Sequence, residues 1–139
     1  MNISCIFSDD FRREADGKYS LMGVYGREML IATPSFTLPK LSITIIVKSN
    51  TDAEGDILYM SIEVNIDGKQ QLKQEVPAEA LKKVADGFKE QGFNTVQHTA
   101  NILMTLLPVK TGNVIEAIVS INGKEMLRDA LSIKLLPTR

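Results

Sequence analysis

Apolar residues alternate strictly with polar ones along much of this 139-residue chain. Because successive side chains of a β-strand point to opposite faces, such alternation predicts strands with one buried face. Ile3, Cys5 and Phe7 share one phase, as do the apolar residues of 41–47 and 58–66. Further strands are predicted at 19–25, 96–107, 114–121, 124–128 and 131–136. About eight short strands with frequent turn signals predict a mostly β fold, an antiparallel two-sheet sandwich of immunoglobulin-like or C2-like type.

One segment breaks the two-residue period. Residues 77–91 place Leu81, Val84 and Phe88 at helical spacing, and Gly92 follows as a stop signal. This pattern predicts a single amphipathic helix whose three apolar side chains are buried. We expect the helix to connect the two sheets and to cover one open end of the sandwich.

A hairpin turn is predicted at Asp67-Gly68-Lys69, because Asp and Gly tolerate positive φ. A two-residue loop would pair Ile66 with Lys69 and Ile62 with Lys73, which places apolar residues opposite charges. A three-residue loop, which is a longer and bulged turn, pairs Val64 with Leu72 and Met60 with Val76 instead. The second register keeps the apolar residues on one face, and it is the one we predict.

A second hairpin turn, Asn122-Gly123-Lys124, lies among residues that echo those around the first. Hairpins select the same residue types for the same physical reasons, so convergence explains the echo better than an internal duplication. The chain contains no linker or low-complexity tract. With 44% hydrophobic and 24% charged residues it has an ordinary globular composition, and we expect a single β-sandwich domain over residues 1–139.

The charge balance bears on possible partners. The 16 Lys and Arg residues against 17 Asp and Glu residues leave a net charge of −1, which lacks the positive field of a nucleic-acid binder. Apolar runs are too short to span a membrane. Cys5 is the only cysteine, and acidic residues follow it before a signal-peptide apolar region develops. We therefore expect a cytoplasmic protein whose partner is a protein, either itself or another chain.

The sequence contains no recognisable catalytic motif. His98 is the only histidine, which excludes multi-histidine metal sites, and its phase on the predicted strand places the ring at the margin of the core. Cys5 lies on an inward phase and fits core packing better than nucleophilic chemistry. None of the Gly-Lys pairs belongs to a phosphate-binding loop. We therefore expect no cofactor and no enzymatic activity.

The densest polar cluster covers residues 9–18. Opposite charges so close in sequence pair with one another, so a structured, solvated loop is the simpler interpretation. The alternative is a site for a small anionic ligand or for calcium, to which Asp52, Glu54 and Asp56 would add oxygen ligands. The candidate ligand-binding residues are Asp10, Arg12, Arg13, Glu14 and Lys18.

Several predicted strands also carry apolar residues in the outward phase. Large contiguous apolar patches are uncommon on monomers, so either the helix or a loop covers these residues, or they form a subunit or partner interface. If 96–107 and 114–121 form a hairpin, their outward residues gather into one patch. The candidate interface residues are Leu103, Leu107, Val114 and Ile118.

Residues 7–26, with the sequence FSDDFRREADGKYSLMGVYG, resemble the opening of a family of small bacterial and prophage-associated proteins. The family's N-termini carry Asp-Asp-x-Arg-x-Glu, a Gly-Lys turn and then Ser-Leu-x-Gly-x-Tyr. No reaction, cofactor or catalytic residue is assigned to that family, so the resemblance implies no enzymatic activity. It implies that a pattern of six residues is a family feature: Asp10, Arg12, Glu14, Lys18, Gly23 and Tyr25.

These observations favour a non-enzymatic β-sandwich module that acts through protein contacts, as a homo-oligomer or as part of a phage-related assembly. The alternative function is the binding of a small anionic ligand or calcium through the charged 9–18 loop.

Overall fold

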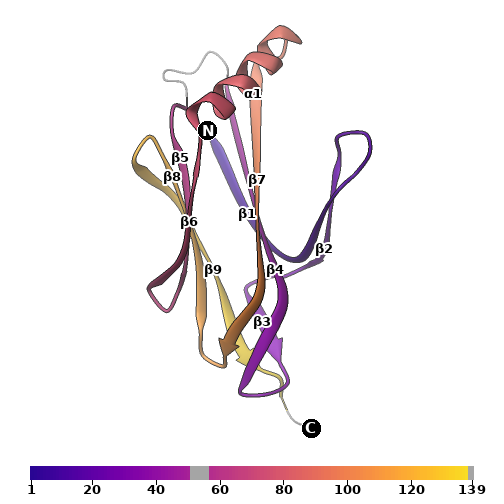
Figure 1. Ribbon diagram of the computed structural model, residues 1–139, viewed down its shortest axis with the longest axis vertical. Helices are drawn as coiled ribbons and strands as arrows, with labels where there is room; N and C mark the ends of the chain where they lie inside the picture. The colour runs from indigo at the N-terminus through magenta and orange to yellow at the C-terminus, as the bar shows by residue number, and fades with distance from the viewer. Residues whose placement is uncertain (51–56, 138–139) are drawn as a thin grey trace.

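The computed structural model describes residues 1–50 and 57–137, which form two facing β-sheets and one helix (Figure 1). The predicted two-sheet sandwich is confirmed. The first sheet has the strand order β2 (Tyr19–Val24), β1 (Asn2–Arg13), β4 (Ser35–Asn50) and β7 (Thr95–Lys110). The second has the order β3 (Glu28–Ile31), β9 (Lys124–Leu135), β8 (Val114–Ile121), β5 (Met60–Ile66) and β6 (Lys69–Val76).

The core lies between the sheets and is formed by the alternating residues identified in the sequence. Ile43 and Ile45 of β4 are fully buried, as are Ile62 and Val64 of β5. Removing apolar surface from water on this scale is the main force holding the two sheets together. The phase of β4 and β5 was therefore correctly predicted.

The β5–β6 hairpin has the predicted register but reaches it by a different route. Val64 pairs with Leu72, and Ile62 faces Gln74 instead of Lys73. The turn itself is the tight two-residue form, with both central residues, Asp67 and Gly68, at positive φ. A β-bulge next to Val64 then shifts the pairing by one residue. The predicted register is confirmed, but the longer turn was wrong: the loop has two residues, and the bulge lies in the ladder.

The echo between the two hairpin turns has a structural counterpart. The Oδ1 atom of Asp67 accepts a hydrogen bond from the backbone N–H of Val114, where β8 begins, at 2.8 Å. The Oδ1 atom of Asn122 accepts one from the N–H of Tyr59, immediately before β5, at 3.0 Å. Each turn thus satisfies a backbone donor at the start of the other hairpin, which explains why both turns select a short side chain with a carbonyl or carboxylate oxygen.

Three parts of the fold differ from the expectation. Strand β3 was missed, and it pairs with β9 in parallel, the exception among otherwise antiparallel neighbours. The alternation marked only 41–47 as a strand here, but β4 begins at Ser35 and continues through Pro39. Opposite Pro39, Leu106 adopts a φ of +51° and shifts the inward phase of β7 by one residue. A local irregularity shared by both strands accommodates the proline, which cannot donate a ladder hydrogen bond.

Helix α1 (Ala78–Glu90) connects the two sheets and lies across one end of the sandwich, as expected (Figure 1). Fewer of its apolar side chains are buried against the sheets than predicted. Leu81 is buried, but Val84 is 38% exposed, and Phe88 is half-buried and packs against the ring of Phe93. The prediction that all three apolar residues are buried was wrong, because only the stripe through Leu81 meets the sheets. Among the described residues, no helix is both long and apolar enough to cross a membrane.

Candidate functional site

The charged segment 9–18 belongs mainly to a projecting β-hairpin and is less of a loop than expected. Strand β1 continues to Arg13, and residues 10–13 pair with β2 but not with β4 (Figure 1). Residues 9–24 therefore form a two-stranded arm that leaves the body of the sandwich. Strand alternation places Asp10 and Arg12 on one face of the arm, with Arg13 on the other. The turn at the tip separates Glu14 from Lys18.

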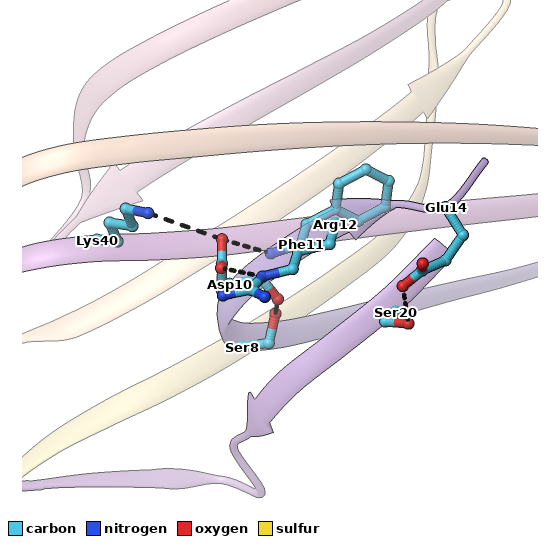
Figure 2. A network of polar contacts seen from close by, with 7 residues as sticks. All are labelled: Ser8, Asp10, Phe11, Arg12, Glu14, Ser20 and Lys40. Carbon is cyan, nitrogen blue, oxygen red and sulfur yellow. Dashed lines mark hydrogen bonds and ion pairs between the residues drawn. The ribbon is translucent and has the colours of Figure 1, made fainter. Parts of the chain in front are cut away.

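Figure 2 shows the polar contacts around Asp10. Its carboxylate accepts hydrogen bonds from the N–H of Phe11 at 2.9 Å and from Arg12 Nε at 3.2 Å. Lys40 Nζ of β4 lies 3.9 Å away. The hydrogen bond from Arg12 is the main cause of a lowered pKa at Asp10. Asp10 therefore stays ionised and anchors the base of the arm to β4.

The remaining candidate residues pair locally. Arg13 lies over the ring of Phe11, which stacks on Tyr19. Glu14 accepts a hydrogen bond from Ser20 at 2.8 Å, and Lys18 forms a 3.0 Å ion pair with Asp16. The structure thus brings Asp10 together with Arg12, and Glu14 near Lys18 at the tip, but it does not gather all five residues. Their arrangement is that of a self-paired, solvated hairpin.

Two residues of the family-like motif hold the arm at its base. The hydroxyl of Tyr25 donates a short hydrogen bond to Asp9 Oδ1, and burial together with this bond raises the pKa of Tyr25. Gly23 has a φ of +64°, and a Cβ there would overlap with the Asp9 carboxylate. Sequence analysis assigned no role to Gly23 or Tyr25. Their contacts explain the Gly-x-Tyr spacing as a support for the arm.

The second group of carboxylates in the calcium alternative, Asp52, Glu54 and Asp56, lies outside the described residues. Within residues 1–50 and 57–137, no three His, Cys, Asp or Glu side chains are grouped to hold a metal ion.

Cys5 packs against the core, as predicted. Burial, with a smaller contribution from the Asp129 carboxylate, raises the pKa of its thiol to about 12. The thiol is therefore protonated at neutral pH and is a poor nucleophile.

The predicted interface patch rests on a pairing that does not occur. β7 and β8 lie in different sheets, so they do not form a hairpin. Leu103 is 48% exposed, but Leu107 turns inward because of the phase shift at Leu106, and it is buried. The premise that Leu103, Leu107, Val114 and Ile118 share one patch was wrong.

Ile118 does point outward, yet its neighbours cover it. It pairs with Glu63 of β5 on one side and with Arg128 of β9 on the other. The long side chains leave it only 6% exposed. Val114 is half-buried. The outer face of the second sheet is therefore polar where an apolar patch was expected.

The free edge of β7 is a feature that the sequence did not reveal. β7 ends the first sheet and runs for 16 residues, twice the length of β6, which ends the second sheet. Residues 95–109 contain no Lys, Arg, Asp or Glu. Leu106 bends the strand and Pro108 removes a donor, so its regular part is 95–105. An uncharged edge of this length is a site where another strand can be added.

A pocket of about 340 Å³ lies where α1 meets the end of the sandwich. Its lining includes Leu81 and Ala85 of α1, Ile57, and Val96 and His98 of β7. His98 is only 6% exposed, and burial lowers its pKa. The prediction that this ring sits at the margin of the core is confirmed. That the margin encloses a pocket could not be read from the spacing of the residues.

Comparison with known proteins adds no relative: no family model matches the chain, and no curated protein sequence matches it significantly.

Proposed function

We propose that this protein is a non-enzymatic module that acts through protein contacts, and that its edge strand β7 pairs with β7 of a second copy. The observation that carries the proposal is the absence of charged side chains from residues 95–109 on a free sheet edge. Natural sheet edges are usually protected by charges, by proline, by bulges or by short length. The regular part of β7 has none of these protections.

Self-pairing suits this edge particularly well. Antiparallel association of two identical strands brings each residue close to a residue of the same segment, so a charge there would face a like charge. The outward side chains of β7 are neutral, with Gln97, Thr99 and Asn101 followed by the exposed Leu103. Pairing two copies about a two-fold axis joins two four-stranded sheets into one of eight strands. It also removes surface of Leu103 from water.

The hairpin arm favours this function over the capture of a small ligand in segment 9–18. Arg12 and Lys18 already pair with Asp10 and Asp16. An anionic ligand would have to compete with carboxylates that are covalently part of the same hairpin. Larger assemblies, including phage-related ones, would then be built from the β7-paired dimer.

The test is the solution mass of the purified protein by light scattering, over a concentration range that reaches high micromolar. We expect twice the chain mass of 15.4 kDa. The double variant Thr99→Lys/Leu103→Lys should be monomeric, because four lysines would then meet at the paired edge. Its matched control, Gln70→Lys/Gln74→Lys on β6, should remain dimeric with the same added charge.

Two results would contradict the proposal. A wild-type protein that is monomeric throughout the range removes self-association. A Thr99→Lys/Leu103→Lys variant that stays dimeric places the interface elsewhere. Melting temperatures of both variants show whether a change of mass reflects unfolding.

A further inference from the structure

The pocket beneath α1 exists because of the residues that the helix turns toward the sheets. Ala78, Leu81 and Ala85 line it at helical spacing, and Leu81 is the buried one. The larger Val84 and Phe88 do not line the pocket. Alanines on the docking face leave space that larger apolar side chains would fill, as they do in a closed core.

His98 supplies an unused polar group inside this space. The side chain is 94% buried, since 6% of its surface is exposed, and it lines the pocket. No described residue forms a hydrogen bond with its ring. A neutral imidazole offers one N–H donor and one nitrogen acceptor. The ring lines the pocket and bonds to no described residue, so its nitrogens can bond to a group that occupies the pocket.

The chemistry of the lining defines that partner. Ile57, Leu58, Leu81 and Val96 give the pocket a mainly apolar wall. The charges of the described lining residues balance, because Glu79 and Asp86 oppose Lys82 and Lys89. A balanced set gives no preference for a net charge on the ligand. The volume of about 340 Å³ is at the lower end of the range for small-molecule sites.

We propose that the pocket beneath α1 binds a small, neutral, mostly apolar molecule that carries one hydrogen-bonding group, with His98 as the partner of that group. The apolar body of the ligand contacts Leu81, Ala85 and Val96. The hydrogen bond to His98 fixes its orientation. This site is independent of the β7 edge, since it lies on the inner face and at the end of that strand.

The test compares two probes that differ by one hydroxyl group, 2-naphthol and naphthalene, by fluorescence titration of the full chain. Replacing His98 by Leu should weaken 2-naphthol binding about 3- to 10-fold more than naphthalene binding, the value of one neutral hydrogen bond. His98→Gln keeps a donor and an acceptor and should restore part of the loss. For each probe, the affinity of a variant is divided by that of the wild type. This ratio cancels the intrinsic difference in hydration between the two probes.

A second pair of variants tests the pocket without changing His98. Ala85→Leu fills the space and should weaken both probes at least tenfold. The control, Lys83→Leu, adds the same side chain at an exposed position of α1 outside the pocket and should leave both affinities unchanged. Melting temperatures confirm that each variant is folded.

The proposal fails if neither probe binds at its solubility limit, or if Ala85→Leu binds both as tightly as the wild type. It also fails if His98→Leu weakens the two probes equally, because His98 would then shape the pocket without bonding to the ligand. None of these outcomes depends on whether β7 pairs with a second copy.

Discussion

β6 and β7 each end one sheet of the sandwich, but the chain treats the two edges differently. β6 is eight residues long and carries Lys69, Lys73 and Glu75. β7 is 16 residues long and has no Lys, Arg, Asp or Glu before Lys110. Both edges present backbone donors and acceptors that a further strand could use. The difference indicates that one edge is protected against pairing and the other is left available for it.

The attachment of the two strands differs as well. β6 joins its neighbour β5 through a tight turn and a bulged ladder. β7 pairs with β4 over most of its length, and Asn101 reinforces that pairing. The Asn101 amide donates to Ser42 Oγ at 2.7 Å and to Thr44 Oγ1 at 3.0 Å. The strand that we propose as an interface on one side thus has a firm connection to the sheet on the other.

The largest expected effect comes from removing the protection of β6. In Lys69→Thr/Lys73→Thr/Glu75→Thr the β6 edge of each molecule is neutral like the β7 edge, so association should continue beyond the dimer into open-ended oligomers. Sedimentation velocity measures the resulting size distribution. The net charge moves only from −1 to −2, because two cations and one anion are lost, so general charge neutralisation is not the cause.

A matched control makes the same charge change away from β6 and β7, in Asp16→Thr/Lys18→Thr/Lys124→Thr. It should sediment like the wild type. If the β6 variant also keeps the wild-type size, then charge does not distinguish the two edges, and the comparison between β6 and β7 loses its basis.

A smaller effect is expected from Asn101→Leu, which tests the attachment of β7. The hydroxyls of Ser42 and Thr44 are fully buried, and the substitution removes a donor that they share. Loss of a partner for buried polar groups costs about 1–3 kcal/mol in the free energy of unfolding. Urea denaturation at one fixed protein concentration measures the change, since the proposed self-association would also contribute to stability.

Gln74→Leu on β6 is the control for this substitution, because Gln74 is exposed. We expect it to change the unfolding free energy by no more than about 0.5 kcal/mol. Equal losses in the two variants would mean that the Asn101 bridge adds nothing to the attachment of β7.

Local features of the fold were predictable from the sequence. Alternation determined the buried phase of β4 and β5, and the Asp67-Gly68 turn determined where the chain reverses. The register followed because apolar residues had to share a face, which led to Val64 opposite Leu72. Helical spacing also located α1. All these signals lie within a few residues of the structure they specify.

Features that depend on distant segments were not predictable. The positive φ of Leu106 arises opposite Pro39, 67 positions earlier, and it reverses the phase of Leu107. The placement of β7 and β8 in different sheets left no apolar patch around Ile118. The charged arm resembled a loop because a hairpin solvated on both faces needs no apolar alternation. Of the candidate residues, only local pairs such as Asp10 with Arg12 follow from proximity in sequence.

The pocket was hidden for the same reason. Ala78 and Ala85 are unremarkable in the helix, and His98 is unremarkable in its strand. They become a site only when α1 is placed across the end of the sandwich, which brings both alanines and the imidazole to one space.

The smallest expected effect is on the pH dependence of stability, and it comes from His98 on the inner face of β7. Burial lowers the pKa of His98 below its ordinary value of 6.5, so the unfolded chain takes up this proton more readily than the folded one. Stability therefore rises with pH through the window below 6.5 and is lost as the pH falls through it. Urea denaturation between about pH 8 and pH 5 should show a steeper loss for the wild type than for His98→Gln, whose side chain does not titrate in this range. Glu79, Asp86 and Lys82 line the same pocket in both proteins, so their contributions cancel in the difference.

The mass of His98→Gln should equal that of the wild type at neutral pH, because the substitution leaves the edge of β7 unchanged. Identical pH profiles would show that His98 has the same proton affinity in the folded and unfolded chain, and a changed mass would show that the inner face and the edge of β7 are coupled.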